Sequence, residues 1–156
     1  MMPTTAPPCH PGYSNVLSPA LGEGSDQTEP LEDRTALLSF FVPKADDWLN
    51  SNQRLHRMVK ANRVKAWREA AAGAVPPGWE PFDEPVRIVA SVWKNRRGRY
   101  DPNNLNTTTK ACVDGFVDAG LLVDDDWEHV IGPDHRHGGI GEPGIIFMFT
   151  KVLKIT

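Results

Sequence analysis

Acidic side chains gather at two points of the sequence that a helical pattern separates. Asp101 stands in the turn RYDPNNL (residues 99–105), and Asp124, Asp125 and Asp126 follow the helical pattern. Neighbouring carboxylates repel one another unless a cation lies between them. Mg²⁺ takes oxygen ligands and is commonly held by one or two carboxylates with water and phosphate. The two points therefore suggest a divalent-metal site, and a plain solvated acidic turn is the alternative interpretation.

Basic side chains form two clusters in the middle of the chain. The first cluster comprises Arg54, Arg57, Lys60, Arg63, Lys65 and Arg68, and the second comprises Lys94, Arg96, Arg97 and Arg99. Either cluster alone is typical of a solvated surface, whereas together they are suited to follow a phosphate backbone. Trp67 and Trp93 lie among these bases, and we expect them to be core residues rather than stacking platforms.

The net charge of −3 conceals this separation of acids and bases. Residues 1–33 hold five acids and no base, residues 34–100 hold 13 bases and six acids, and residues 101–156 hold four bases and nine acids. A basic middle segment followed by an acid-rich end is a reason to consider a polyanionic partner.

Other chemistries find less support. His129, His135 and His137 fall in or near a glycine-rich segment with neither a helix nor a cysteine partner, which does not favour a zinc site. Cys112 falls on an apolar helix face and is expected to be buried. The chain has no phosphate-binding loop and no dinucleotide fingerprint, so we expect no nucleotide cofactor.

The elements that must position these residues follow from apolar periodicity and from breakers. The patterns predict strands at 37–42, 85–93, 128–131 and 145–155, helices at 52–72 and 106–119, and a glycine- and histidine-rich loop at 132–144. This order predicts an α+β fold, with a small mixed β-sheet and two main helices in a single domain spanning residues 34–156.

Each predicted helix has an apolar face. In the first helix, one face is shared by Leu55, Val59, Ala66 and Ala70. The second should bury Leu105, Cys112, Val113 and Phe116, and should expose Lys110, Asp114 and Asp118 on its other side.

The first 33 residues hold six of the 14 prolines and few apolar side chains, which predicts a disordered acidic tail. The chain shows neither an apolar run of the roughly 18 to 20 residues that cross a bilayer nor a secretory signal. Cys9 and Cys112 cannot build a disulfide framework, so we expect a cytoplasmic protein that does not enter a membrane.

The stretches DPNNL (101–105), KACVD (110–114) and AGLLVDD (119–125) together resemble the core of the RusA-type Holliday junction resolvases, small endonucleases often encoded by phages. The family pattern is Asp-x-Asp-Asn-Leu, a nearby Lys, a helix bearing Ala and Asp, then Ala-Gly, three mostly apolar residues and an Asp pair. The segment NSNQRLH (50–56) resembles the family's early Asn-rich segment, so the resemblance covers residues 37–131.

The resemblance implies a homodimeric, Mg²⁺-dependent endodeoxyribonuclease, with Mn²⁺ as a substitute, that nicks two strands of a four-way DNA junction in recombination and repair. Asp101 matches the first metal-binding acid, and Lys110 matches the essential lysine. The distal acid is Asp125 when counted from Ala119-Gly120, and Asp126 when counted back from the following strand. The ten clustered bases would then contact branched double-stranded DNA.

The chain departs from the family pattern at two places. Asn103 stands where the family has its second acid, and three extra residues separate Leu105 from Lys110. An amide oxygen can still ligate a metal, but one negative charge is lost, unless Asp126 replaces it. Two further hypotheses therefore stand beside the junction nuclease: a junction-binding protein without catalysis, and a nuclease for other DNA structures or single strands.

Overall fold

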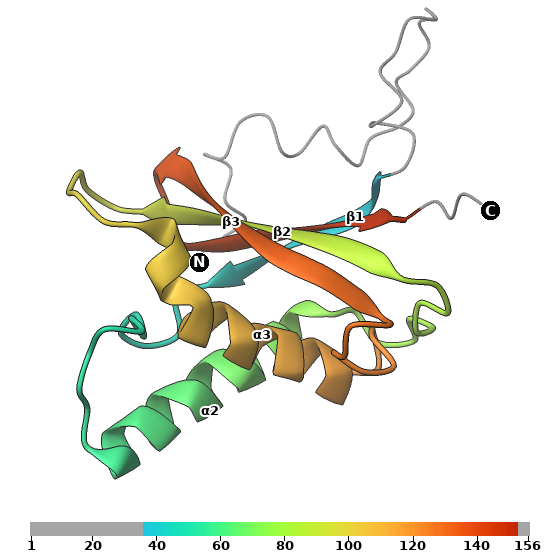
Figure 1. Ribbon diagram of the computed structural model, residues 1–156, viewed down its shortest axis with the longest axis horizontal. Helices are drawn as coiled ribbons and strands as arrows, with labels where there is room; N and C mark the ends of the chain where they lie inside the picture. Colours follow the sequence, from blue (N-terminus) through green and yellow to red (C-terminus); the bar gives the residue numbers. More distant parts are fainter. Residues whose placement is uncertain (1–35, 153–156) are drawn as a thin grey trace, which may run out of the picture.

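Four strands form one mixed β-sheet, and two helices lie on one of its faces (Figure 1). The computed structural model describes residues 36–152, so the predicted acidic tail lies outside the described residues. The elements are β1 (Ala36–Pro43), α2 (Arg57–Ala74), β2 (Val86–Lys94), the short 3₁₀ helix η2 (Pro102–Leu105), α3 (Asn106–Asp118), β3 (Val130–Ile140) and β4 (Gly144–Lys151). The predicted single-domain α+β arrangement is confirmed.

The strand order across the sheet is β1-β4-β2-β3. β4 pairs antiparallel with β1 and with β2, whereas β2 and β3 are parallel. Parallel neighbours need a crossover connection, and η2 with α3 supplies it between β2 and β3. The segment after β2 and the segment before β3 therefore begin at opposite ends of the sheet, with α3 running between them.

The core lies between the sheet and the two helices. Phe116 of α3 is fully buried, and its ring centroid lies 5.1 Å from that of Phe147 and 5.4 Å from that of Phe149 in β4. The predicted apolar side of α3 is confirmed, because Leu105, Cys112, Val113 and Phe116 are all buried. Trp67 and Trp93 are buried as expected, the latter on β2.

The prediction of a loop at 132–144 is wrong, because β3 continues to Ile140 and pairs with β2 as far as Lys94. The predicted strand at 128–131 is only the start of this longer strand. The glycines have a packing role: a Cβ on Gly138 or Gly139 would overlap the Trp93 indole. The glycine content that suggested a loop therefore reflects an aromatic ring lying against the backbone of an edge strand.

Helix α2 begins five residues later than the predicted start at 52. His56 caps it, with Nδ1 accepting a hydrogen bond from the backbone N–H of Met58 at 3.1 Å. Before the cap, Asn50 Oδ1 accepts from the backbone N–H of Asn52 at 2.8 Å. Such side-chain bonds offer the backbone an alternative to the helix, which explains the later start.

The apolar face predicted for α2 is confirmed only in part, because Leu55 and Ala70 pack against the core without being fully buried. Trp67 and Ala71 are its buried residues, whereas Val59 is 40% exposed and Met58 is 60% exposed. Residues 57–62 are all exposed, so the first third of the 18-residue helix extends beyond the core. Val59 lies in this part of the helix, which explains why its apolar side chain is exposed.

The segment between β1 and α2 is held against α3. The backbone N–H of Leu49 donates to Thr108 Oγ1 at 2.8 Å, and the same hydroxyl donates to the Leu49 carbonyl oxygen at 2.9 Å. Trp67 Nε1 donates to the carbonyl oxygen of Asp47 at 3.1 Å. These bonds set the position of α2 beside α3. No helix of residues 36–152 is long and apolar enough to cross a bilayer.

Candidate functional site

Asp101 begins η2, and its carboxylate caps that short helix. Oδ1 accepts from the backbone N–H of Asn103 at 3.0 Å, and the Asp101 carbonyl oxygen accepts from the backbone N–H of Asn104 at 2.9 Å. Pro102 follows, with a fixed φ that suits the first helical position. The Asp-Pro turn therefore has a structural role of its own, whatever else its carboxylate binds.

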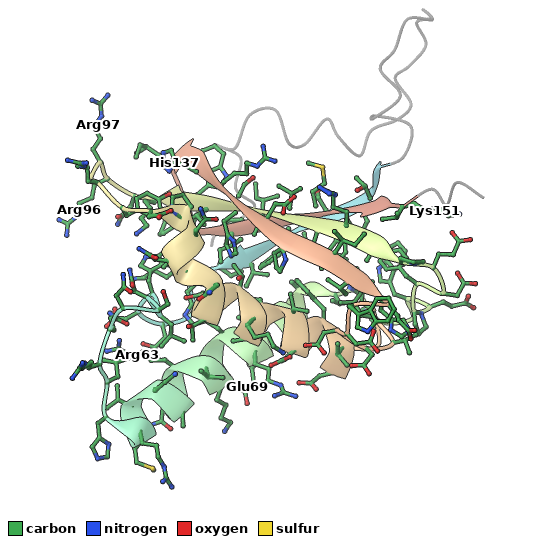
Figure 2. The ribbon with its side chains drawn as sticks, in the orientation of Figure 1. Arg63, Glu69, Arg96, Arg97, His137 and Lys151 are labelled. Carbon is green, nitrogen blue, oxygen red and sulfur yellow. The ribbon has the colours of Figure 1, made fainter. Side chains whose placement is uncertain are left out.

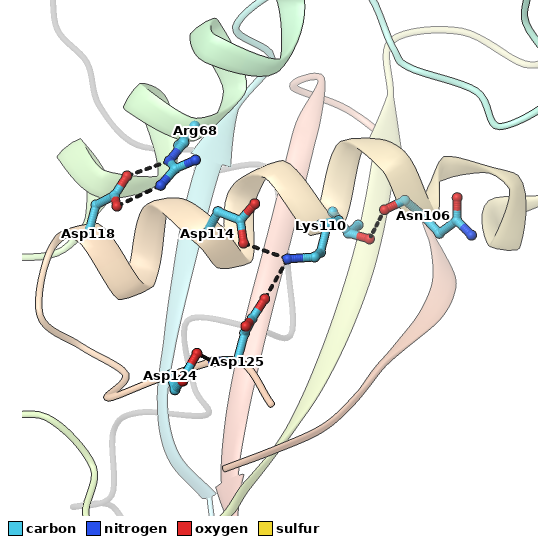
Figure 3. A network of polar contacts seen from close by, with 8 residues as sticks. Arg68, Asn106, Lys110, Asp114, Asp118, Asp124 and Asp125 are labelled. Atoms are coloured by element: carbon cyan, nitrogen blue, oxygen red, sulfur yellow. Dashed lines mark hydrogen bonds and ion pairs between the residues drawn. The ribbon is translucent and has the colours of Figure 1, made fainter. Parts of the chain in front are cut away.

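Lys110 lies between two carboxylates on the exposed side of α3 (Figure 3). Its Nζ is 2.6 Å from Asp114 Oδ1, one helical turn further on, and 2.5 Å from Asp125 Oδ2 in the loop after the helix. Side chains four residues apart share a helix face, which explains the first contact. The second contact depends on the loop 119–129 returning alongside α3.

These ion pairs set the charge of the group. Hydrogen bonds from the ammonium to Asp114 and then to Asp125 raise the pKa of Lys110. The hydrogen bond from Lys110 lowers the pKa of Asp125 in return. At neutral pH the lysine is therefore protonated and Asp125 is ionised, so two carboxylates share one ammonium.

The other two aspartates of the acidic turn bind elsewhere. Asp124 Oδ1 accepts from the backbone N–H of Asp125 at 2.7 Å. Asp126 Oδ1 accepts from the backbone N–H of Glu128 at 3.1 Å and contacts His129 Nδ1 at 2.5 Å. That contact lowers the pKa of Asp126 and raises the pKa of His129. Of the two candidates for the distal acid, Asp125 is the one that contacts Lys110.

An open cavity of about 490 Å³ runs along α3, between α2 and the start of β3. We call it the α3 groove. Its polar lining includes Thr109, Lys110, Asp114, Asp125 and His135, and its apolar lining includes Val64, Val113, Val130 and Pro133. Asp101, Asn103 and Asp126 do not line it. The sequence-predicted site is therefore divided: Lys110 and Asp125 face one groove, and the Asp101 turn lies outside its lining.

The carboxylate oxygens of the groove suit a cation such as Mg²⁺, which prefers oxygen ligands and needs few of them from the protein. Within residues 36–152, no group of three His, Cys, Asp or Glu side chains gathers as a metal site. Mg²⁺ is commonly held by one or two carboxylates, with water and phosphate completing the shell. Asp125 and Asp114 supply such oxygens at the groove wall, and their excess negative charge favours a cation there.

Two histidines of β3 contact the α3 and η2 region, which the loop prediction did not anticipate. His135 Nε2 lies 2.8 Å from Thr109 Oγ1. His137 Nδ1 lies 2.5 Å from the Tyr100 hydroxyl. The alternation of DHRH (134–137) is the signal that would have placed both histidines on one face of a strand. The three histidines of this part of the chain thus have separate partners, because His129 contacts Asp126.

Tyr100 also forms one side of an aromatic site for Lys94. The Lys94 ammonium lies 4.1 Å from the Tyr100 ring centroid and 5.0 Å from that of Trp48. Burial, and then the charge of Lys44, lower the pKa of Lys94. Burial raises the pKa of Tyr100 to about 12. Lys94 is therefore engaged within the fold and is less available to a phosphate than its neighbours in the same cluster.

The remaining bases divide into paired and unpaired groups. Arg63 pairs with Asp46 and Asp47, Lys65 with Glu69, and Arg68 with Asp118. Arg54, Arg57, Lys60, Arg96, Arg97 and Arg99 are exposed and have no ion pair with any residue of the described range 36–152. In Figure 2, Arg96 and Arg97 project from the loop after β2, toward the same end of the molecule as Arg63 of α2. The unpaired bases thus come from both basic clusters of the sequence, and they are six of the ten bases in those clusters.

No protein-family model matches the chain, and no curated protein sequence matches it either.

Proposed function

We propose that the protein is a Mg²⁺-dependent endodeoxyribonuclease that resolves four-way DNA junctions as a homodimer. The observation that carries the proposal is the Lys110 ammonium held between Asp114 and Asp125 at the wall of an open groove. The resemblance of residues 101–125 to the RusA-type resolvases names the same lysine, and Asp125 is one of the two positions that it allows for the distal acid. Phosphodiester hydrolysis needs a positive group near the phosphate oxygens and an acid to hold a cation.

The unpaired bases support a polyanionic substrate. Arg96, Arg97 and Arg99 extend the loop that leads directly to Asp101, and no acid pairs with them among residues 36–152. Arg54, Arg57 and Lys60 add positive charge around the start of α2. When Lys and Arg side chains bind DNA phosphates, the counterions bound to those phosphates are released, and this release drives non-specific DNA affinity. Two copies related by a two-fold axis would present this surface to the two strands that a junction nuclease cuts.

The chain's own residues have distinct tasks in this proposal. Asp125 would hold Mg²⁺ at the groove wall. Asp101 and the Asn103 amide, the other ligands that the resemblance implies, lie outside the groove lining and would have to reach the same ion from the η2 side. When bound, Mg²⁺ lowers the pKa of a bound water and offsets charge on the phosphate. Lys110 stays protonated because two carboxylates surround it, so it can stabilise charge on a non-bridging oxygen. Asp114 orients the lysine from one turn away.

The test is cleavage of a synthetic four-way junction in Mg²⁺, with flap and single-stranded DNA as competing substrates. We expect paired nicks in the junction, and loss of nicking in Asp101→Asn and Asp125→Asn. Asp83→Asn is the matched control, because it removes an exposed carboxylate outside the groove lining. Equal cleavage by the wild type and Asp101→Asn, or none by either, contradicts the proposal. Preference for flap or single-stranded DNA would favour the other nuclease hypothesis.

A second candidate is a junction-binding protein that does not cleave. Asn103 in place of an acid, and the absence of a three-ligand metal group within residues 36–152, favour it. A titration with Mg²⁺ and Mn²⁺ separates the candidates. Affinity for the junction that does not change with either ion, together with no cleavage, supports the binder.

A further inference from the structure

We propose that His135, which lines the α3 groove together with Lys110 and Asp125, is the group that takes the proton from the attacking water. This inference rests on the proposed nuclease function and adds a residue to it. His135 lies on β3, beside Ala90 of the central strand β2, and lines the same groove as Lys110 and Asp125. A proton acceptor must share a site with the groups that hold the phosphate, and His135 meets that requirement.

The proposed role needs one of the two tautomers of His135, and the contacts of the Thr109 hydroxyl are compatible with it. This hydroxyl has one proton, and it donates that proton to the Asn106 carbonyl oxygen at 3.2 Å, an atom that can only accept. With the hydroxyl proton in that bond, Thr109 Oγ1 accepts the 2.8 Å contact from His135 Nε2–H. In this arrangement the neutral imidazole carries its proton on Nε2, and Nδ1 is the acceptor. A hydrogen bond on one ring nitrogen commonly sets the role of the other in this way.

The other titratable groups of the groove cannot serve as the acceptor at neutral pH. Lys110 is protonated and bonded to two carboxylates, and the lowered pKa of Asp125 makes it a weak base. Asp114 is bonded to the lysine. Outside the groove, His129 contacts Asp126 and His137 contacts Tyr100. Among the described residues that line the groove, His135 is the one neutral nitrogen base.

The surroundings of His135 hold it in the unprotonated form. Burial lowers its pKa, and the charges of Asp134 on its own strand and of Asp101 before η2 oppose that effect in part. On the α3 side it meets the neutral Thr109 hydroxyl, and on the β2 side its register partner is the apolar Ala90. An imidazole that is unprotonated at neutral pH can accept a proton from water.

The step balances without any further reactant. The water oxygen forms a bond to phosphorus as the bond from phosphorus to one sugar oxygen breaks. The water proton passes to His135 Nδ1, and the released sugar oxygen is protonated by solvent. The resulting imidazolium then returns its proton to solvent, which restores the neutral ring for the next turnover.

The experiment compares His135→Gln with His137→Gln, a histidine on the same strand outside the groove lining. In single-turnover cleavage we expect His135→Gln to lose about 100-fold or more in rate, while its Kd for the junction stays within about twofold. The wild-type rate should rise with pH through the His135 pKa, and this limb should vanish in the variant. Added imidazole should accelerate His135→Ala and leave the wild type unchanged.

A second readout does not depend on cleavage. The ¹⁵N shifts of the His135 ring should report the Nε2–H tautomer, and Thr109→Val should abolish that preference while Thr109→Ser keeps it. An Nδ1–H tautomer in the wild type overturns the inference. Wild-type cleavage combined with an unchanged rate and pH profile in His135→Gln overturns the inference alone. No cleavage by the wild type under any metal overturns the proposed function, and the role of His135 with it.

Discussion

Lys110 and Asp125, which are 15 residues apart in the sequence, form a 2.5 Å ion pair that ties α3 to the loop that follows it. Asp114 completes the contact from the same helix, so the ammonium is held from two sides (Figure 3). A flexible lysine side chain thereby gains a defined position at the groove wall. That position, rather than its charge alone, distinguishes Lys110 from the other exposed bases.

Lys110→Gln should abolish junction cleavage while it changes stability little. The amide cannot neutralise Asp114 and Asp125, and it removes the charge that would meet the phosphate. The Lys110 side chain is 62% exposed, so its ion pairs should contribute no more than about 1 kcal/mol to stability. Cleavage rates and urea unfolding measure the two effects. Lys65→Gln, which breaks the exposed pair with Glu69, is the control and should retain cleavage.

Asp125→Asn and Asp126→Asn should differ sharply. Asp125 lines the groove and contacts Lys110, whereas Asp126 contacts His129 and the backbone of its own turn. We therefore expect Asp125→Asn to lose cleavage and Asp126→Asn to keep most of it. An NMR titration should show the His129 pKa falling back toward 6.5 in Asp126→Asn. Equal loss of cleavage in both variants would mean that Asp126 leaves His129 to bind the metal.

Much of the fold could be predicted because its signals are local. The alternation of β2 and the apolar side of α3 depend on near neighbours in the sequence, and both were found. The extent of β3 was missed because it depends on a distant partner. Gly138 and Gly139 signal a loop locally, but the Trp93 indole packs against them and leaves no room for side chains.

The sequence was enough to select residues of the candidate site, but it did not predict which of them lie together in the structure. The helical spacing placed Lys110 and Asp114 on one exposed side of α3, where the structure shows them as an ion pair. The choice of Asp125 over Asp126 depends on how an eleven-residue loop folds back, which no spacing rule decides. His135 was assigned to a loop, so its place in the groove could not be inferred. Asp101 was expected beside the distal acid. It instead caps η2, the short helix that precedes α3, and does not line the α3 groove.

Gly115→Ala should destabilise the protein, although alanine is the better helix former. Gly115 lies where α3 meets α2, and a Cβ there would overlap the Arg68 carbonyl oxygen and lie 3.0 Å from the Ala71 Cβ. We expect a loss of about 1–3 kcal/mol in the free energy of unfolding. Gly73→Ala in α2 is the control, since nothing lies within 4 Å of its Cβ position. That control should gain about 0.5–1 kcal/mol, and a loss there would contradict the argument.

The bond between Arg68 and Asp118 should make the packing of α2 on α3 depend on acid pH. Arg68 Nε and Nη2 donate to the two carboxylate oxygens at 2.5 and 2.9 Å, and this bond lowers the pKa of Asp118 below 3.8. A lowered carboxyl pKa means that the stabilisation is present above pH 3.8 and is lost as the pH falls through the folded-state value. The arginine stays protonated throughout.

A double-mutant cycle of Arg68→Gln and Asp118→Asn measures this dependence. The coupling between the two residues should be constant from pH 7 to about pH 5 and should fall as the pH decreases below 3.8 through the folded-state pKa of Asp118. Urea unfolding at each pH provides the free energies. A stability difference between the wild type and Asp118→Asn that does not change with pH would show that the contact does not depend on the ionised carboxylate.

Replacing Arg96 and Arg97 together with glutamine should weaken junction binding in a salt-dependent way. Both side chains project from the loop after β2 (Figure 2), and no acid within residues 36–152 pairs with either. Each phosphate contact contributes about 0.9 to the slope of log K against log salt concentration. The double variant should therefore lower the magnitude of that slope by about 1–2. Lys65→Gln should change the slope less, because Glu69 already offsets that charge. An unchanged slope in the arginine variant would place the DNA on another surface of the protein.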